Sequence, residues 1–247
     1  MNSLLFSTMM GFGVGGVGVG LGGLVACGID RRSEKTPWLI LSVAAGMIFA
    51  LLGLELLPES VRTGGYLVSL SGIITGLLFI FLLEQVSHRV VIITSNPRRS
   101  RFIRSGLWFA LGIAIHNFPV GFAMGTSLVN QPRMGFDLAT TMLFHNFPEG
   151  LAMSLPFIIA GVNRLVIPML ASVVSVPSGL GAFLGTTLNN PNGGYLAFIC
   201  GIAIGTILFV TWHEILGHAR KKLVLPTLVP CLLVGLLLGK LITFLLE

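Results

Sequence analysis

The sequence predicts an all-α integral membrane protein with eight transmembrane helices, and three observations support this fold class. The chain of 247 residues is 54% hydrophobic and only 10% charged, whereas soluble domains carry about 25% charged residues. Its apolar segments have the length of about 20 residues that crosses a bilayer. The connections between them are too short for a separate folded domain. We therefore expect residues 1–247 to form a single transmembrane domain.

The first expected span is rich in glycine, which would indicate a flexible linker in water. In a bilayer, small residues instead let helices pack closely. The longest connection, about residues 88–103, is basic and is expected in the cytoplasm. The expected spans cover residues of about 4–28, 37–57, 66–87, 104–128, 136–160, 164–188, 194–217 and 223–246.

Basic residues predict the orientation of these spans. With eight spans, both termini lie on the same side of the membrane. If the odd-numbered connections are cytoplasmic, twelve lysines and arginines lie inside and three outside, as the positive-inside rule requires. Both termini are then expected outside the cytoplasm in a multi-pass protein of the cell membrane. The net charge of +6 follows from this orientation and does not indicate a nucleic-acid partner.

Internal symmetry relates the second span to the seventh. Gly46 precedes Glu55 by nine residues, and Gly205 precedes Glu214 by nine. The fourth and fifth spans share a longer motif, and each of these pairs crosses the membrane in opposite directions. The pattern predicts a 3+2+3 inverted repeat. Such repeats place the substrate site near the midplane and support alternating access.

The fourth and fifth spans carry the motif His-Asn-Phe-Pro-x-Gly-x-Ala-Met, which begins at His116 and again at His145. Polar and ionisable groups are costly inside a membrane and usually mark function. His145 and Glu149 are four residues apart and share a helix face. Imidazole and carboxylate ligands suit zinc and neighbouring divalent ions. The candidate metal ligands are His116, Asn117, His145, Asn146 and Glu149.

These segments resemble the ZIP (Zrt/Irt-like) family of divalent metal transporters, whose fourth and fifth spans carry His-Asn-x-Pro-Glu-Gly-type motifs. The resemblance extends over essentially the whole chain, including Glu55-Leu-Leu-Pro-Glu59 and His213-Glu214-Ile-Leu. It implies facilitated import of a divalent transition metal without ATP. Zinc is favoured, with Fe²⁺, Mn²⁺, Co²⁺ and Cd²⁺ as alternatives, and no cofactor is expected. It further implies that spans one, four, five and six move against the others, often in a homodimer.

Two positions depart from the family pattern. The fourth-span glutamate, which bridges two metals in many members, is Val120 here. Alignment of residues 180–182 with the family's Glu-Pro-Leu-Gly-Ala segment places the sixth-span glutamate at Ser178. We therefore expect one surviving site, built from the two motif histidines and the fifth-span glutamate. Asn117, Asn146, water or Ser178 would complete it.

Further polar groups lie near the ends of the second and seventh spans. Glu55 and Glu59 are four residues apart near the expected outer end, and His213 and Glu214 lie near the inner end. We expect them to line the two mouths of an ion pathway. Interfacial capping is the alternative role, particularly for Glu59.

Two rival functions remain open at this point. An intramembrane metallohydrolase would require His-Glu-x-x-His, but His213 is followed by His218, which lies about 140° further round the helix. The chain is therefore not expected to be an enzyme. A degenerate ZIP-like metal sensor or scaffold is the second rival, because Val120 removes a charged ligand.

Overall fold

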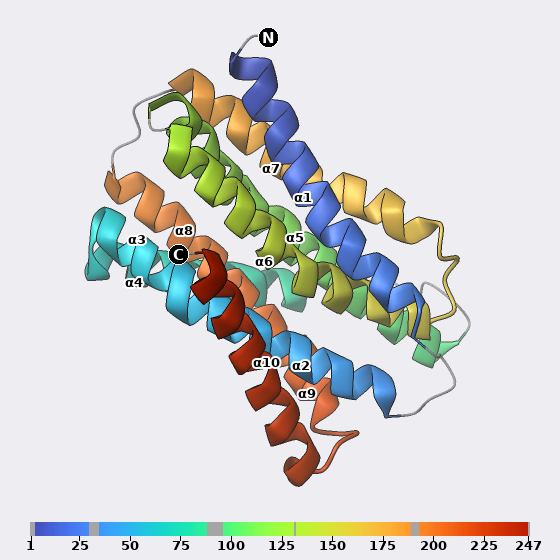
Figure 1. Ribbon diagram of the computed structural model, residues 1–247. Coiled ribbons are helices and arrows are strands. Elements are labelled where there is room, and N and C mark those ends of the chain that lie inside the picture. Colours follow the sequence, from blue (N-terminus) through green and yellow to red (C-terminus); the bar gives the residue numbers. More distant parts are fainter. Residues whose placement is uncertain (1–2, 30–34, 88–95, 131, 189–192, 247) are drawn as a thin grey trace.

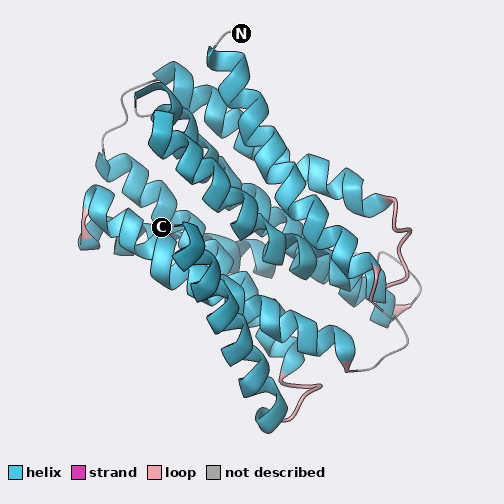
Figure 2. Cartoon of the chain, viewed as in Figure 1, coloured by secondary structure: helices cyan, strands magenta, loops and turns pink. Residues whose placement is uncertain are grey.

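The computed structural model describes residues 3–29, 35–87, 96–130, 132–188 and 193–246. These ranges contain helices and no strand (Figure 2), which confirms the predicted all-α class. The elements (Figure 1) are α1 (Ser3–Cys27), α2 (Thr36–Leu51), the π-helical turn η1 (Leu52–Leu56), α3 (Leu57–Gly64), α4 (Tyr66–Ser87), α5 (Pro97–Asn130), α6 (Pro132–Ile159), α7 (Val166–Leu188), α8 (Gly193–Val210), the π-helical turn η2 (Thr211–Leu216), α9 (Gly217–Ala219) and α10 (Leu225–Leu246).

Within the described ranges, six helical segments are long and apolar enough to cross a membrane. The segment Tyr66–Leu82 of α4 is apolar but shorter, and α6 carries the polar fifth-span motif. The membrane class is thus confirmed, whereas the count of eight spans stays a prediction. The six segments are Ser3–Cys27, Thr36–Gly64, Pro97–Asn130, Val166–Leu188, Gly193–Ala219 and Leu225–Phe244.

Helix α5 begins at Pro97, seven residues before the predicted start of the fourth span. Asn96 explains the difference, because its side-chain oxygen accepts hydrogen bonds from the backbone amides of Arg98 (3.0 Å) and Arg99 (3.2 Å). Asparagine is a favoured N-cap, and proline is favoured at the first helical position. The final part of the expected basic loop therefore forms the first turns of a helix.

The second span also extends further than expected. Helix α2 continues through η1 into α3 and ends at Gly64, where the positive φ of Gly65 (83°) stops the helix. Pro58 is accommodated because it lies in the first turn after η1. The helix thus crosses a proline at which the sequence pattern predicted an end.

The helices form two groups that lie side by side (Figure 1). In the first, α5 packs on α6 and α7, and α1 packs on the same two helices. In the second, α4 packs on α8, and α2 packs on α10. The groups meet where α5 contacts α8 and where α2 contacts α6. The candidate site therefore lies on helices of the first group that also contact the second.

Close helix crossings in the second group depend on glycine. A Cβ on Gly46 of α2 would collide with the carbonyl of Leu232 in α10, and a Cβ on Gly205 of α8 would collide with the carbonyl of Ile73 in α4. Gly46 and Gly205 are 159 residues apart, and so are Ile73 and Leu232. Each residue of one crossing thus has a counterpart in the other crossing at the same distance along the chain. The two crossings therefore have the same register.

Candidate metal centre

The core of the site is formed by two histidines and one glutamate from the middle of α5 and α6. His116 comes from α5, and His145 and Glu149 lie one turn apart on α6. All three are buried, with exposed fractions of 0%, 5% and 3%. One ligand atom of each lies within 4.8 Å of the others. The structure thus brings together three of the predicted ligands.

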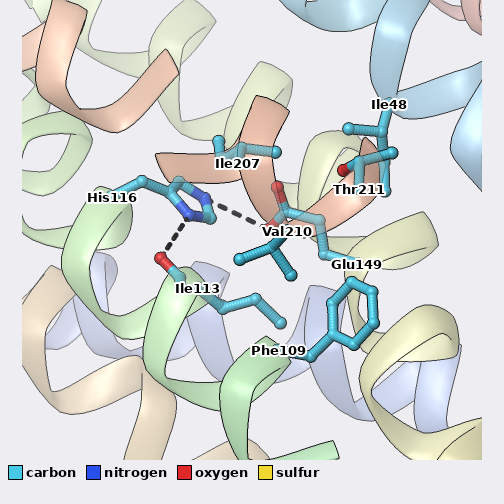
Figure 3. Close-up of a pocket in the computed structure, with 9 residues that line it drawn as sticks. Ile48, Phe109, Ile113, His116, Glu149, Ile207, Val210 and Thr211 are labelled. Atoms are coloured by element: carbon cyan, nitrogen blue, oxygen red, sulfur yellow. Dashed lines mark hydrogen bonds and ion pairs between the residues drawn. The ribbon is translucent and has the colours of Figure 1, made fainter. Parts of the chain in front are cut away.

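Glu149 lies between the two imidazole rings. Its Oε2 is 3.1 Å from Nε2 of His116, and its Oε1 is 3.1 Å from Nε2 of His145. Neither pair has hydrogen-bond geometry, and these atoms have no other hydrogen-bond partner among the described residues. Figure 3 shows the His116 ring turned toward the carboxylate, with aliphatic side chains around both. Four polar atoms are therefore held close together without satisfying one another.

The backbone fixes which nitrogen of His116 carries the proton. Its Nδ1 lies 3.1 Å from the carbonyl oxygen of Gly112. A carbonyl can only accept a hydrogen bond, so Nδ1 is the protonated nitrogen of the neutral ring. Nε2 then presents a lone pair toward Glu149. This arrangement of a ligating nitrogen and a backbone-bonded second nitrogen is common at metal sites.

The two nitrogen–oxygen separations suit a small divalent cation, and the three ligand atoms all lie within 4.8 Å of one another. In a tetrahedral zinc site with Zn–N and Zn–O distances of about 2.0–2.1 Å, the ligand atoms lie about 3.3 Å apart. The two nitrogen–oxygen distances of 3.1 Å are close to that value. An ion among these atoms would supply the positive charge that a buried carboxylate needs.

The neighbouring candidates are engaged differently. Asn117 donates a hydrogen bond from Nδ2 to the carbonyl of Val174 in α7 (3.2 Å). Ser178 donates to the carbonyl of Gly11 in α1 (2.7 Å). Asn146 is completely buried, and neither atom of its amide has a hydrogen-bond partner in the described part of the chain. Of these three side chains, Asn146 is thus the one with unused polar atoms.

The predicted pathway residues occupy three different environments. Glu55 lies in η1 with a buried, unpartnered Oε2 among the described residues, and it interacts electrostatically with His145. Glu59 pairs with Arg62 (3.2 Å) and is 39% exposed. His213 is exposed and stacks on Phe209 at a centroid distance of 5.5 Å. Glu214 belongs to η2, but its side chain lies outside the described residues.

A narrow cavity that the sequence analysis missed lies against His116 and Glu149. Its other walls come from α2, α5, α8 and η2, including Ile48, Phe109 and Thr211 (Figure 3). With about 10 Å³ open to the centre of a water-sized sphere, it has room for about one water molecule. Aliphatic residues in aliphatic helices give no sequence signal of such a role.

Phe109 also borders a second cavity. That cavity lies between Trp38 of α2, Ser105 of α5 and His218 of α9, and the ring of His218 stacks on that of Trp38 (6.1 Å, 13°). Phe109 is therefore part of the walls of both cavities, the one at the candidate ligands and the one nearer the basic start of α5.

The chain has relatives among known zinc transporters. The family model described as ZIP Zinc transporter matches residues 93–247. The chain is 28% identical over 227 residues to the zinc transporter ZupT of Chlorobium limicola, with 83% of this chain and 85% of that protein covered. It is 27% identical over 245 residues to the zinc transporter ZupT of Lysinibacillus sphaericus, with coverage of 87% and 89%. Members of the matched family are transporters and not enzymes. This chain belongs to the ZIP zinc transporter family.

Proposed function

We propose that the chain imports divalent transition-metal ions, with zinc as the favoured substrate, through a site formed by His116, His145 and Glu149. The observation that carries the proposal is the buried convergence of two imidazole nitrogens on one carboxylate at 3.1 Å without hydrogen-bond geometry. The related zinc transporters support zinc. Fe²⁺, Mn²⁺, Co²⁺ and Cd²⁺ are tested as competing substrates. Asn146 is proposed as a further ligand.

We propose alternating access as the mechanism. The site is carried by the first helix group, and the adjoining cavity is closed by Ile48 and Thr211 from the second group. Relative movement of the two groups would widen this cavity. Displacement of the Phe109 ring would then join it to the cavity beside His218, which gives a route toward the cytoplasm. Glu55, Glu59, His213 and Glu214 are proposed to serve the outer and inner ends of the path.

We further propose eight spans in a 3+2+3 inverted repeat. The shared offset of 159 between the α2–α10 and α4–α8 crossings supports it, as do π-helical turns that begin at Leu52 and Thr211. Contacts of the first group follow the same rule. A Cβ on Gly22 would collide with the carbonyl of Phe147, and a Cβ on Gly181 would collide with the carbonyl of Phe118. The two glycines are 159 residues apart, and the two phenylalanines are separated by the motif spacing of 29. A homodimer in the bilayer is proposed from the family resemblance and is tested by cross-linking in native membranes.

Orientation can be tested by cysteine labelling from outside the cell. Tyr66, which is 79% exposed, begins α4 at the end proposed to face outward. The exposed Lys222 lies in a connection proposed to face the cytoplasm. In a background with Cys27, Cys200 and Cys231 replaced by alanine, Tyr66→Cys should react with an impermeant maleimide and Lys222→Cys should not. The reverse pattern would overturn the proposed orientation.

The function is tested with purified protein in liposomes that contain a zinc-sensitive dye. Zinc uptake by wild-type protein, and its loss in Glu149→Ala, would support transport through the site. Zinc binding without uptake would instead identify a sensor or scaffold. Turnover of a peptide or lipid would favour the metallohydrolase. Uptake by Glu149→Ala at the wild-type rate would overturn the site assignment.

A further inference from the structure

Met142 extends the polar face of α6 beyond the metal ligands. Residues 142, 145, 146 and 149 follow the spacing i, i+3, i+4 and i+7, which places them on one helix face. Met142 is 2% exposed and precedes His145 by three residues. Residues at this spacing are neighbours on a helix, with Cβ atoms about 5–6 Å apart. The thioether therefore belongs to the face that carries the site.

The segments that precede the two motif copies differ at the position of this methionine. Ile113 holds the corresponding position in α5, three residues before His116, and it lines the cavity at the site. On α6 the same position carries sulfur instead of a hydrocarbon. The two halves of the site therefore differ in donor chemistry at matched positions.

The sulfur atom lies beside a hydroxyl group whose proton is already used. Sδ of Met142 is 3.6 Å from Oγ of Ser178, while the same hydroxyl donates to the carbonyl of Gly11 at 2.7 Å. A hydroxyl has a single proton, so the shorter bond leaves the lone pairs of the thioether largely available. Asn146, one turn further on the same face, also has an unpartnered and fully buried amide.

We propose that Met142 is a soft ligand that contacts the ion on its way to or from the site of His145 and Glu149 and biases selection toward thiophilic cations. This inference rests on the proposed transport function. Thioether sulfur favours soft and borderline ions, whereas carboxylate and carbonyl oxygens suit Mn²⁺ and Mg²⁺. Ser178 and Val120 supply no carboxylate, so the sulfur adds a donor of a different class. Cd²⁺ and Zn²⁺ gain from it, and Mn²⁺ does not.

The competing explanation is that Met142 only fills space, as buried methionines often do. Met142→Leu removes the sulfur and preserves the volume. Met124→Leu is the matched control because Met124 is also fully buried, eight residues beyond His116 on α5. The ratio of Cd²⁺ uptake to Mn²⁺ uptake in liposomes should fall about tenfold in Met142→Leu and stay unchanged in Met124→Leu. A packing role would change both metals equally.

X-ray absorption at the cadmium edge provides a readout independent of transport. With Cys27, Cys200 and Cys231 replaced by alanine, sulfur scattering should appear in the Cd²⁺ complex and in the Met124→Leu control, and it should vanish in Met142→Leu. If Met142→Leu does not fold, Met142→Ile copies the α5 residue and serves as the second variant. An unchanged uptake ratio, or no sulfur shell in the parent protein, overturns this inference. Glu149→Ala tests the proposed function separately, because it should abolish uptake of both metals.

Discussion

At the scale of single residues, burial of Glu149 between two imidazoles requires a compensating positive charge. Its carboxylate is 3% exposed, and an unpaired buried charge is very costly. In the neutral ring of His116, the bond from Nδ1 to the Gly112 carbonyl leaves a lone pair on the nitrogen that faces Glu149. A metal ion would satisfy all of these atoms at once, which supports the proposal that they bind the transported ion.

Glu149→Gln should therefore abolish zinc uptake while the protein still folds. The amide keeps the shape of the side chain but removes the negative charge that holds the cation. Uptake into liposomes and elution on size exclusion measure the two effects. Glu59→Gln is the comparison variant. Glu59 is 39% exposed, pairs with Arg62 and is proposed only for the outer end of the path, so its maximal uptake rate at saturating zinc should stay near the wild-type value. Equal losses in the two variants would contradict the assignment of Glu149.

Val120→Glu should increase metal binding. The new carboxylate lies one turn after His116 and on the same helix face, at the position that Glu149 holds in the second motif. Native mass spectrometry should show a second bound zinc ion, or the first ion should resist a chelator for longer. No change in either measurement would mean that residue 120 does not face the site.

The sequence predicted the residues of the candidate metal centre better than it predicted the contacts of the side chains around them. Two copies of one motif marked His116, His145 and Glu149, because polar groups in apolar membrane helices are costly and usually have a function. The engagement of Ser178 by Gly11 could not be predicted, because a neighbouring helix supplies the acceptor. Met142 gave no signal at all, since methionine in an apolar helix usually packs in a core.

At the scale of helices, η1 and η2 are the most unusual elements. They begin at Leu52 and Thr211, and π-helical turns often occur at functional sites. Glu55 lies within η1 and interacts electrostatically with His145. The sequence echo between these spans was visible, but hydropathy contains no signal for a π turn. Most helix ends were predictable within a few residues, except where the Asn96 cap extended α5 and where the second span continued through η1 and α3 to Gly64.

Glu55→Gln should raise the half-saturating zinc concentration with a modest change in maximal rate. The negative charge of Glu55 attracts cations before they reach the site, and its loss weakens capture first. Zinc uptake measured over a range of concentrations separates the two parameters. A fall in maximal rate at unchanged half-saturation would contradict a capture role.

Gly235→Ala should destabilise the protein by about 1–3 kcal/mol, the usual cost of overpacking. The added methyl group would collide with the backbone carbonyl of Val43 in α2, which cannot move without displacing the helix. Thermal denaturation in detergent gives the measurement. Gly13→Ala on α1 is the control, because nothing lies within 4 Å of its added methyl group, and it should be neutral or slightly stabilising. Similar losses in both variants would exclude the close crossing as the cause.

At the scale of the whole molecule, the proposed metal ligands and part of the wall of the adjoining cavity come from different helix groups. The first group carries the ligands on α5 and α6, and the second group closes the adjoining cavity with Ile48 and Thr211. The sequence predicted a repeat but not this division, because it depends on which aliphatic faces meet. This division is what the proposed alternating access requires, because movement of one group against the other would then open or close the cavity beside the ligands.

Zinc should raise the thermal stability of the folded protein. A ligand that binds only the folded state stabilises it by about 2.7 kcal/mol at a concentration of 100 times Kd. The melting temperature in detergent should therefore rise with zinc concentration, and Glu149→Gln should remove this dependence. A zinc-dependent rise of equal size in that variant would indicate binding elsewhere in the protein.

The burial of the candidate metal centre also determines the electrical current expected across a bilayer that contains this protein. A ligand set that is at most 5% exposed and adjoins a cavity with room for about one water molecule provides no continuous aqueous pore. Under the proposed alternating access, each ion would wait for a helix rearrangement, and such motions take microseconds to milliseconds. A planar bilayer that contains this protein should therefore show no unitary current steps, even while zinc accumulates on the far side.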